Sequence, residues 1–314
     1  MNTSDAISAA VRDAAALWLP HAEFGLVELS GPDAAEFLHR LCSQDVAALA
    51  DGEVRPAAFL NPKGKLVAVC RVGRLSDRYV VETALGARAE VAELLDRYHF
   101  TERLGIRVRD DLACGAVVGT DALGASGWRA GSVRPVGGGL GLAVERHGLQ
   151  RVAWHLPPNE SAPADVVARL PLATPERAEL LRIVAGDVAV GIDTDATTLA
   201  LEAALDDHVS TTKGCYTGQE IVARIHTYGH VNRQLRLLQI DVDDAPAPGT
   251  SLVETEDGEK VGRTMSAVRF ADGRVAALGY VAREFATAGT TLRLAGADAP
   301  VQVCDFGPPN ATAT

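Results

Sequence analysis

Apolar residues in the first hundred positions form short strand-like runs and two helical repeats. Runs over 25–29, 54–60, 65–72 and 78–82 predict strands, and "NPKG" is a turn sequence between the second and third. A helix follows the start signals Ser30 and Pro32, with Ala34, Phe37, Leu38 and Leu41 at helical spacing. A second helix is predicted over 87–104, with Val91, Leu94, Leu95 and Tyr98 on one face.

The middle of the chain adds more elements of both kinds. Strands are predicted over 140–145 and 151–155, followed by a helix that Ser161 opens with Pro163 in its first turn. Another helix starts near Thr174 and ends at Gly186, a residue that commonly terminates helices. The mixture of helices and antiparallel strands predicts an α+β body with split halves.

The pattern changes after Arg233. Six strand-like runs alternate with turns such as "APAPG" and "EDGE"; they cover 235–242, 251–254, 261–270, 274–281, 291–294 and 301–306. This is typical of a small closed β-barrel. We therefore predict two domains, an α+β body over 20–233 and a β-barrel over 234–314.

Composition excludes several classes of protein. The chain has 314 residues, 47% of them hydrophobic, and lacks the apolar run that a membrane span needs. Its start does not read as a secretory signal, so we expect a cytoplasmic protein without membrane partners. A net charge of −11 argues against general nucleic-acid binding, and the five scattered cysteines indicate neither a disulfide framework nor a cysteine metal knuckle.

The segment "TKGCYTGQE" at 212–220 is the strongest candidate for chemistry. Helical spacing from Gly218 onward places Cys215 just ahead of a helix N-terminus and close to Lys213. Both features favour the thiolate, which is the reactive and metal-binding form of cysteine. The alternative is a structural turn whose cysteine is partly buried and inert.

Two specific chemistries remain open beside these. A thiol hydrolase needs a histidine base, for which His208, His226 and His230 are candidates by proximity in the sequence. A Cys/His metal site could use His226 and His230, but Gly229 interrupts the helix between them, and we predict no metal site. The arginine-rich stretch at 224–236 could meet an anionic small ligand or simply face water.

The segment from Lys213 to Glu220, continuing into "IVAR", resembles the YgfZ-type folate-binding proteins. These are relatives of the aminomethyltransferase, or T protein, of the glycine cleavage system. The resemblance also covers "GPDAAEFLHRLCSQDV", "FLNPKGKLVAVCRV", "RIVAGDVAVGIDTD" and the terminal β module. It implies a GcvT-like fold of two interleaved α/β subdomains plus a small C-terminal β-barrel, three lobes around a central hole.

The resemblance also implies a ligand and a set of site residues. Tetrahydrofolate or a derivative is expected in the central hole, with Cys215 as the key functional residue and Lys213 supporting it by position and charge. The implied cofactor-binding residues are Phe24, Tyr216, Gln219, Glu220, Arg224 and Arg233. The expected role is assembly or repair of iron–sulfur clusters in client enzymes such as tRNA-modifying enzymes.

Departures from the superfamily pattern bear on the alternative, a folate-dependent aminomethyl or one-carbon transferase. Where aminomethyltransferases carry a catalytic aspartate, the matching stretch offers Ala68 and Val69. Where the superfamily has a pterin-binding glutamate, this chain has Val184, and Ala178 replaces an aromatic. Loss of the carboxylate disfavours aminomethyl transfer, and loss of the glutamate indicates weak or differently organised pterin binding. Whether any substrate is turned over stays open.

Overall fold

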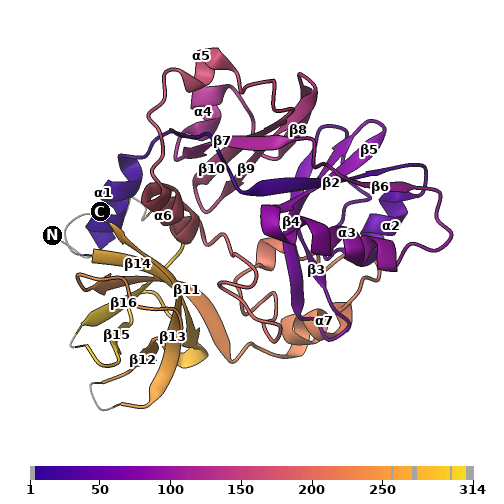
Figure 1. Ribbon diagram of the computed structural model, residues 1–314. Coiled ribbons are helices and arrows are strands. Elements are labelled where there is room, and N and C mark those ends of the chain that lie inside the picture. The colour runs from indigo at the N-terminus through magenta and orange to yellow at the C-terminus, as the bar shows by residue number, and fades with distance from the viewer. Residues whose placement is uncertain (1–3, 256–257, 271–273, 298, 309–314) are drawn as a thin grey trace.

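Three bodies built from antiparallel strands make up the fold in the computed structural model (Figure 1). The structure describes residues 4–255, 258–270, 274–297 and 299–308. Two of the bodies are five-stranded sheets and the third is a closed barrel. The predicted α+β fold with a C-terminal barrel is confirmed. The central hole stays a prediction.

The first sheet has the strand order β3-β4-β5-β2-β6. Its elements are β2 (Phe24–Ser30), α2 (Ala34–Leu41), β3 (Val54–Leu60), β4 (Leu66–Leu75), β5 (Arg78–Ala84), η1 (Leu85–Ala87), α3 (Arg88–Arg97) and β6 (Gly105–Val108). One apolar cluster joins the buried faces of α2 and α3 to the strands, through Phe37, Leu38, Val91 and Leu95 among others. The four apolar positions predicted for the first helix are the buried residues of α2.

The predicted helix over 87–104 is wrong beyond Arg97. Tyr98, placed on its buried face, is 37% exposed. The chain leaves the helix and returns as β6, which pairs with the end of β2 at the edge of the sheet. This short edge strand alternates exposed and half-buried residues and so carries too few apolar positions to reveal itself in the sequence.

The second sheet has the order β1-β7-β10-β9-β8. Its elements are β1 (Leu17–Leu19), β7 (Ala113–Gly119), α4 (Ala122–Ser126), β8 (Ser132–Val136), β9 (Gly139–Arg146) and β10 (Leu149–Leu156), with α1 (Ser4–Arg12) ahead of them. The edge strand β1 precedes the whole first sheet in the chain yet pairs with β7. The two sheets are therefore interleaved in sequence, as the resemblance implied.

Two helices follow the second sheet. The helix expected from Ser161 is a single turn, α5 (Ala164–Val167), with Pro163 at its N-cap. The next helix, α6 (Pro175–Ala185), has the predicted ends. Thr174 accepts a hydrogen bond from the backbone N–H of Arg177, and Gly186 takes the left-handed conformation at φ 65°.

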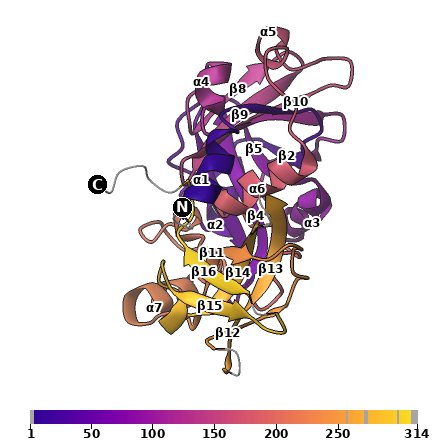
Figure 2. The ribbon, with the colours of Figure 1, turned by 90° about the vertical axis from the view of Figure 1, so that its left-hand side faces the viewer.

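The barrel closes in the order β11-β14-β13-β12-β15-β16, with β16 pairing back to β11. Its elements are β11 (Arg233–Asp241), β12 (Ser251–Val253), β13 (Lys260–Phe270), β14 (Arg274–Ala282), η3 (Arg283–Phe285), β15 (Thr291–Leu294) and β16 (Pro300–Cys304). Along β11 the side chains alternate: Leu238 and Ile240 belong to one core cluster, whereas Leu235 and Leu237 pack in another with α6. That second cluster also holds α1, which lies beside α6 (Figure 2).

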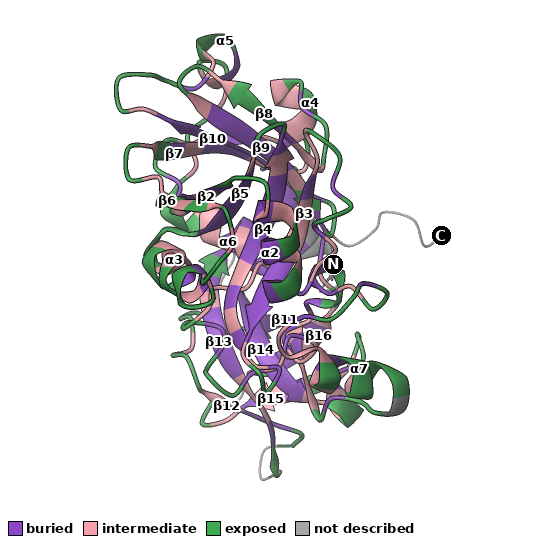
Figure 3. Ribbon diagram, turned by 90° about the vertical axis from the view of Figure 1, so that its right-hand side faces the viewer, coloured by how far each residue is buried: buried purple, intermediate pink, exposed green. Residues whose placement is uncertain are grey.

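An irregular segment over 187–218 lies between the three bodies (Figure 1). It contains η2 (Asp206–His208) and leads into α7 (Gln219–Tyr228) below β3 and β4. Much of α7 is exposed (Figure 3). The cysteine segment singled out in the sequence is the end of this irregular stretch.

Candidate functional site

Lys213 anchors the cysteine loop to the first sheet's helix α2. Its ammonium donates hydrogen bonds to three backbone carbonyls at the helix end, those of His39, Cys42 at 2.8 Å and Gln44 at 3.1 Å. The last carbonyls of a helix lack partners within the helix, and a cation there also suits the helix dipole. Lys213 is only 8% exposed, and burial lowers the pKa of its ammonium. The lysine therefore caps α2 and fixes the loop.

Other hydrogen bonds hold the same loop at both ends. The backbone N–H of Ser210 donates to the carbonyl of Ser43 at 2.9 Å, and that of Thr217 donates to the carbonyl of Arg40 at 3.3 Å. The hydroxyl of Ser43 donates to the carbonyl of His208 at 2.6 Å. The loop is thus joined to the end of α2 by contacts before, at and after Lys213.

Tyr216 packs the loop against a cluster of apolar residues. Its ring is buried in a cluster with Leu60, Leu66 and Val222, and the ammonium of Lys213 lies 4.9 Å from the ring centroid. Burial raises the pKa of Tyr216 to about 12. Tyr216 is therefore a buried residue of the loop rather than an open ligand contact.

Gly218 makes the turn from the loop into α7 possible. Its φ of 83° lies in the left-handed region, and a Cβ there would sit 2.6 Å from the carbonyl oxygen of Asn61. Glycine avoids both the strain and the clash. The sequence prediction of a helix starting at this glycine is confirmed by α7.

Cys215 is the one exposed cysteine of the five. Cys42, Cys70 and Cys114 are buried, and Cys304 is half-buried. Burial raises the pKa of each of these four thiols, because it removes the water that would stabilise the charged thiolate. Lys213 and Tyr216, both buried, hold the backbone of the loop that carries this exposed cysteine.

The other predicted site residues are distributed over separate regions. Gln219 begins α7 half-buried, and the exposed Glu220 forms an ion pair of 2.9 Å with Arg224 one turn later. Arg233 starts β11, pairs with Glu202 at 3.1 Å and stacks on Tyr280. These contacts place Cys215, Lys213 and Tyr216 in one loop but do not bring the arginines to it.

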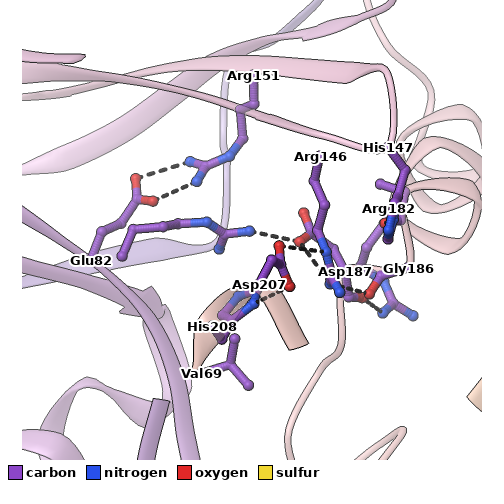
Figure 4. A network of polar contacts seen from close by, with 12 residues as sticks. Val69, Glu82, Arg146, His147, Arg151, Arg182, Gly186, Asp187, Asp207 and His208 are labelled. Atoms are coloured by element: carbon purple, nitrogen blue, oxygen red, sulfur yellow. Dashed lines mark hydrogen bonds and ion pairs between the residues drawn. The ribbon is translucent and has the colours of Figure 1, made fainter. Parts of the chain in front are cut away.

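Phe24 lies at a buried ion-pair network between the two sheets. The guanidinium of Arg151 stacks on its ring at 3.9 Å. The same guanidinium donates two hydrogen bonds of 2.9 and 2.5 Å to the carboxylate of Glu82 (Figure 4). His155 contacts the same carboxylate at 2.9 Å. Burial alone would raise the pKa of Glu82, but Arg151 and His155 hold it well below its usual range.

The second part of this network ties the irregular segment to both sheets (Figure 4). Asp187 accepts a hydrogen bond of 2.6 Å from Arg71 of β4, and Arg146 of β9 donates to the carbonyls of Gly186 and Ala204. Burial opposes ionisation of Asp187, yet the two arginines keep its pKa below the usual value. These charged side chains are paired with other protein groups, so the network holds the two sheets and the irregular segment together.

In the part of the chain that the structure describes, none of the three histidines proposed from the sequence forms a hydrogen bond with Cys215. His208 is 1% exposed, with Nδ1 2.8 Å from Asp207, and burial lowers its pKa. His226 and His230 lie exposed at the end of α7 and beyond it. The histidine beside the loop is His39 of α2, which sequence reasoning missed: Nε2 is 3.9 Å from where a Cβ on Gly214 would lie. No local sequence signal connects positions so far apart.

Two cavities are of moderate size. One, of about 370 Å³, is lined by residues 50–54 and 129–131. The other, of about 290 Å³, lies between α7 and β11, with His226, Gln234 and Arg236 among its polar lining. Among the described residues, no group of three or more His, Cys, Asp or Glu side chains is placed to hold a metal ion. No helix in the described ranges is long and apolar enough to cross a membrane.

Comparison with known proteins agrees with this architecture. The family described as GCVT N-terminal domain matches residues 4–123. A crystal structure of the glycine cleavage system aminomethyltransferase T from Bartonella henselae superposes with a TM-score of 0.80 at 21% identity, covering 96% of this chain and 88% of that one. At this identity the likeness shows the fold alone.

Two sequence relatives come from a bacterium and a fungus. The tRNA-modifying protein YgfZ of Klebsiella pneumoniae is 26% identical over 81% of each chain. An iron–sulfur cluster assembly factor IBA57 homologue, mitochondrial, of Mycosarcoma maydis is 26% identical over 79% of this chain and 63% of its own length. The chain is thus similar in sequence to YgfZ-type proteins and in part to the GCVT N-terminal domain.

Another relative is a chloroplastic protein of Arabidopsis thaliana, provisionally named a transferase. It is 24% identical over 86% of this chain and 66% of its own length. The chain thus spans about two thirds of two of these relatives and four fifths of the third.

Proposed function

We propose that this protein acts in the assembly or repair of iron–sulfur clusters in client enzymes such as tRNA-modifying enzymes, with Cys215 as its reacting group. The observation that carries the proposal is an exposed cysteine on a loop that buried neighbours hold in place. The names of the bacterial and fungal relatives, a tRNA-modifying protein and an iron–sulfur assembly factor, support this class of role.

The chemistry of a thiolate suits such a role. Thiolates are the ligands that hold iron–sulfur clusters, and they are also the nucleophilic form of cysteine. A sulfur on a fixed, exposed loop can reach a cluster or a sulfur atom held by another protein. The four less exposed cysteines lie in sheets, helix ends or the barrel, where a bulky partner has less access.

Lys213 supports Cys215 in this proposal through position. The sequence predicts that its charge supports the cysteine directly, but its ammonium donates to the carbonyl of His39 in α2 and to those of Cys42 and Gln44 just beyond the helix. Its positive charge still lies two residues from the sulfur. Its main contribution is to keep the loop on the first sheet.

One residue of this chain does not suit the folate that the resemblance implies. Val184, which stands where the family has a pterin-binding glutamate, is fully buried among Leu180, Leu181 and the barrel. An apolar side chain cannot accept hydrogen bonds from a pterin, and this one faces no open space. The residues at this position therefore do not fit the pterin, and we derive no chemical step through a folate.

A tetrahydrofolate-type ligand remains part of the proposal only as a binding partner to be tested. Phe24 offers a half-buried aromatic face, backed by Arg151. Arg224 and Arg233 are the candidates for the ligand's carboxylates, although each already pairs with a glutamate. Calorimetric titration of tetrahydrofolate into wild type and Phe24→Ala tests this binding. Saturable binding that the substitution weakens would support it, and no binding to wild type would contradict it.

Cluster repair is tested with a purified tRNA-modifying iron–sulfur enzyme that has been damaged by an oxidant. Ferrous iron, sulfide and the protein are added, and recovery of cluster absorbance is followed. We expect wild type and Cys304→Ser to speed recovery, and Cys215→Ser to act no better than buffer. Equal recovery with Cys215→Ser would show that the thiol is not the reacting group.

The alternative transferase activity lacks structural support. Ala68 of β4 is 1% exposed and Val69 is half-buried, so neither supplies the carboxylate that aminomethyl transfer requires. The fold similarity to an aminomethyltransferase does not extend to a catalytic acid at these two positions. We therefore do not carry a transferase as a second proposal.

A further inference from the structure

The cavity of about 290 Å³ between α7 and β11 has no part in the proposed function. Its walls come from the irregular segment ahead of the Cys215 loop, the second half of α7, and the chain that enters the barrel (Figure 1). Five of the nine lining residues are apolar, and the polar ones are Asp206, His226, Gln234 and Arg236. Small-molecule sites have this composition, and a volume at the low end of their range suits a ligand the size of an amino acid.

Hydrogen bonds hold the walls of this cavity in place. The backbone N–H of Leu235 donates to the carbonyl of Glu202 at 2.8 Å, which joins β11 to the irregular segment. Two residues later in that segment, the carbonyl of Ala204 accepts a hydrogen bond of 2.6 Å from Arg146. The cavity is therefore preformed, which lowers the entropic cost of ordering it around a ligand.

Arg236 brings to the cavity a positive charge that the protein compensates only in part. Its side chain is 26% exposed, and Nη1 lies 3.6 Å from the carboxylate of Asp305, which is 78% exposed; this is too far for a hydrogen bond. Nη2 donates to Oε1 of Gln234 at 2.9 Å, which leaves the amide nitrogen of Gln234 as a further donor. The lining of the cavity thus has donors and positive charge available for a carboxylate.

Asp206 brings the opposite charge to the same cavity. Within the described ranges, its carboxylate forms no hydrogen bond and no ion pair, so it does not pair with Arg236. Two unlike charges that line one cavity without pairing each favour the opposite charge on a ligand. An α-amino acid carries an ammonium and a carboxylate on one carbon. The apolar part of the lining, which includes Leu201, Ile225 and Val231, suits an apolar side chain.

We propose that this cavity binds a free α-amino acid with an apolar side chain. Arg236 and Gln234 bind the carboxylate, Asp206 binds the ammonium, and the apolar wall takes the side chain. A carboxylic acid or an amine alone would leave one of the two charges of the cavity without a partner. None of the lining residues belongs to the cysteine loop at 212–218, so the site goes beyond the proposed function and does not depend on it.

Calorimetric titration of L-leucine into the full-length protein tests the site. Two further probes each lack one of the charges of leucine: isocaproate keeps the carboxylate, and leucinamide keeps the ammonium. The variants are Arg236→Met and Asp206→Asn. Their matched controls are Arg97→Met and Asp244→Asn, since both residues are exposed and lie outside the cavity. Circular dichroism checks that each variant is folded.

We expect saturable binding of L-leucine to wild type and to both controls, tighter than that of either single-charge probe. Arg236→Met should weaken leucine and isocaproate by about tenfold, which corresponds to about 1.4 kcal/mol, and should not weaken leucinamide. Asp206→Asn should weaken leucine and leucinamide by a similar factor and should not weaken isocaproate. A merely structural role of either residue would weaken all three probes alike.

Any of three results would overturn the inference. One is the absence of saturable leucine binding to wild type, and another is binding of isocaproate or leucinamide as tight as that of leucine. The third is a substitution of Arg236 or Asp206 that leaves leucine binding unchanged or weakens all three probes equally. The comparison of the probes on wild type needs no variant. None of these measurements involves Cys215 or a client enzyme, so failure here is distinct from failure of the proposed function.

Discussion

Replacing Lys213 by methionine should destabilise the protein, because Lys213 anchors the loop that carries Cys215, the cysteine that we propose as the reacting group. Methionine keeps the length of the side chain and removes its three donors. The carbonyl of Cys42 is buried and would lose its partner, at a cost of about 1–3 kcal/mol. The carbonyls of His39 and Gln44 are partly buried and regain water, with a smaller loss.

The magnitude follows from these three acceptors. Hydrogen bonds to a charged group contribute about 1.5–3 kcal/mol each, but relief of the buried ammonium's desolvation offsets part of the loss. We expect the free energy of unfolding to fall by about 2–4 kcal/mol. Lys213→Arg should not restore it, because a planar guanidinium cannot converge on three carbonyls as an ammonium does.

Urea unfolding followed by far-ultraviolet circular dichroism measures this loss. Tryptophan fluorescence is less suitable because Trp18, Trp128 and Trp154 all belong to the second sheet's region, away from the loop. The matched control is Lys63→Met, since Lys63 is exposed. If Lys213→Met unfolds within about 0.5 kcal/mol of wild type, as ordinary surface substitutions do, the anchoring role is refuted.

Three further substitutions test other parts of the structure. Gly218→Ala should lower the free energy of unfolding in urea by about 1–3 kcal/mol, through left-handed strain and a clash with Asn61; an unchanged midpoint would contradict the turn geometry. Glu82 has its folded pKa below its ordinary 4.5, so its stabilisation is present above pH 4.5 and lost as the pH falls. Glu82→Gln should be less stable at pH 7 and lose less on acidification, as calorimetric melting from pH 7 to pH 3 would show. Val184→Glu should destabilise by about 3–5 kcal/mol and not improve tetrahydrofolate binding in a titration; tighter binding would show that a pterin reaches this position.

Local signals in the sequence predicted much of the fold. Thr174 and Gly186 bound α6 because capping depends on residues adjacent to the helix ends. The barrel strands were recognisable since inward and outward side chains alternate along each of them. The edge strand β6 and the short α5 were misjudged, because elements of four residues hold too little periodicity.

The site was predicted only where its chemistry is local. The sequence indicated that Cys215 lies just ahead of a helix N-terminus and close to a lysine, and the loop and α7 agree with that arrangement. It could not indicate which groups the lysine binds, because its three acceptors, at the end of α2 and just beyond it, are 169 to 174 residues away. The same separation hides His39, whose place beside Gly214 depends on how α2 packs against the irregular segment.

The most direct test of the account asks whether one sulfur atom carries the function in a cell. A bacterial strain lacking its YgfZ would be given this chain as wild type, Cys215→Ser or Cys304→Ser, and its thiolated and methylthiolated tRNA nucleosides quantified by mass spectrometry. We predict that wild type and Cys304→Ser restore these nucleosides, whereas Cys215→Ser leaves them at the level of the empty strain despite normal folding. Full restoration by Cys215→Ser would contradict the central claim.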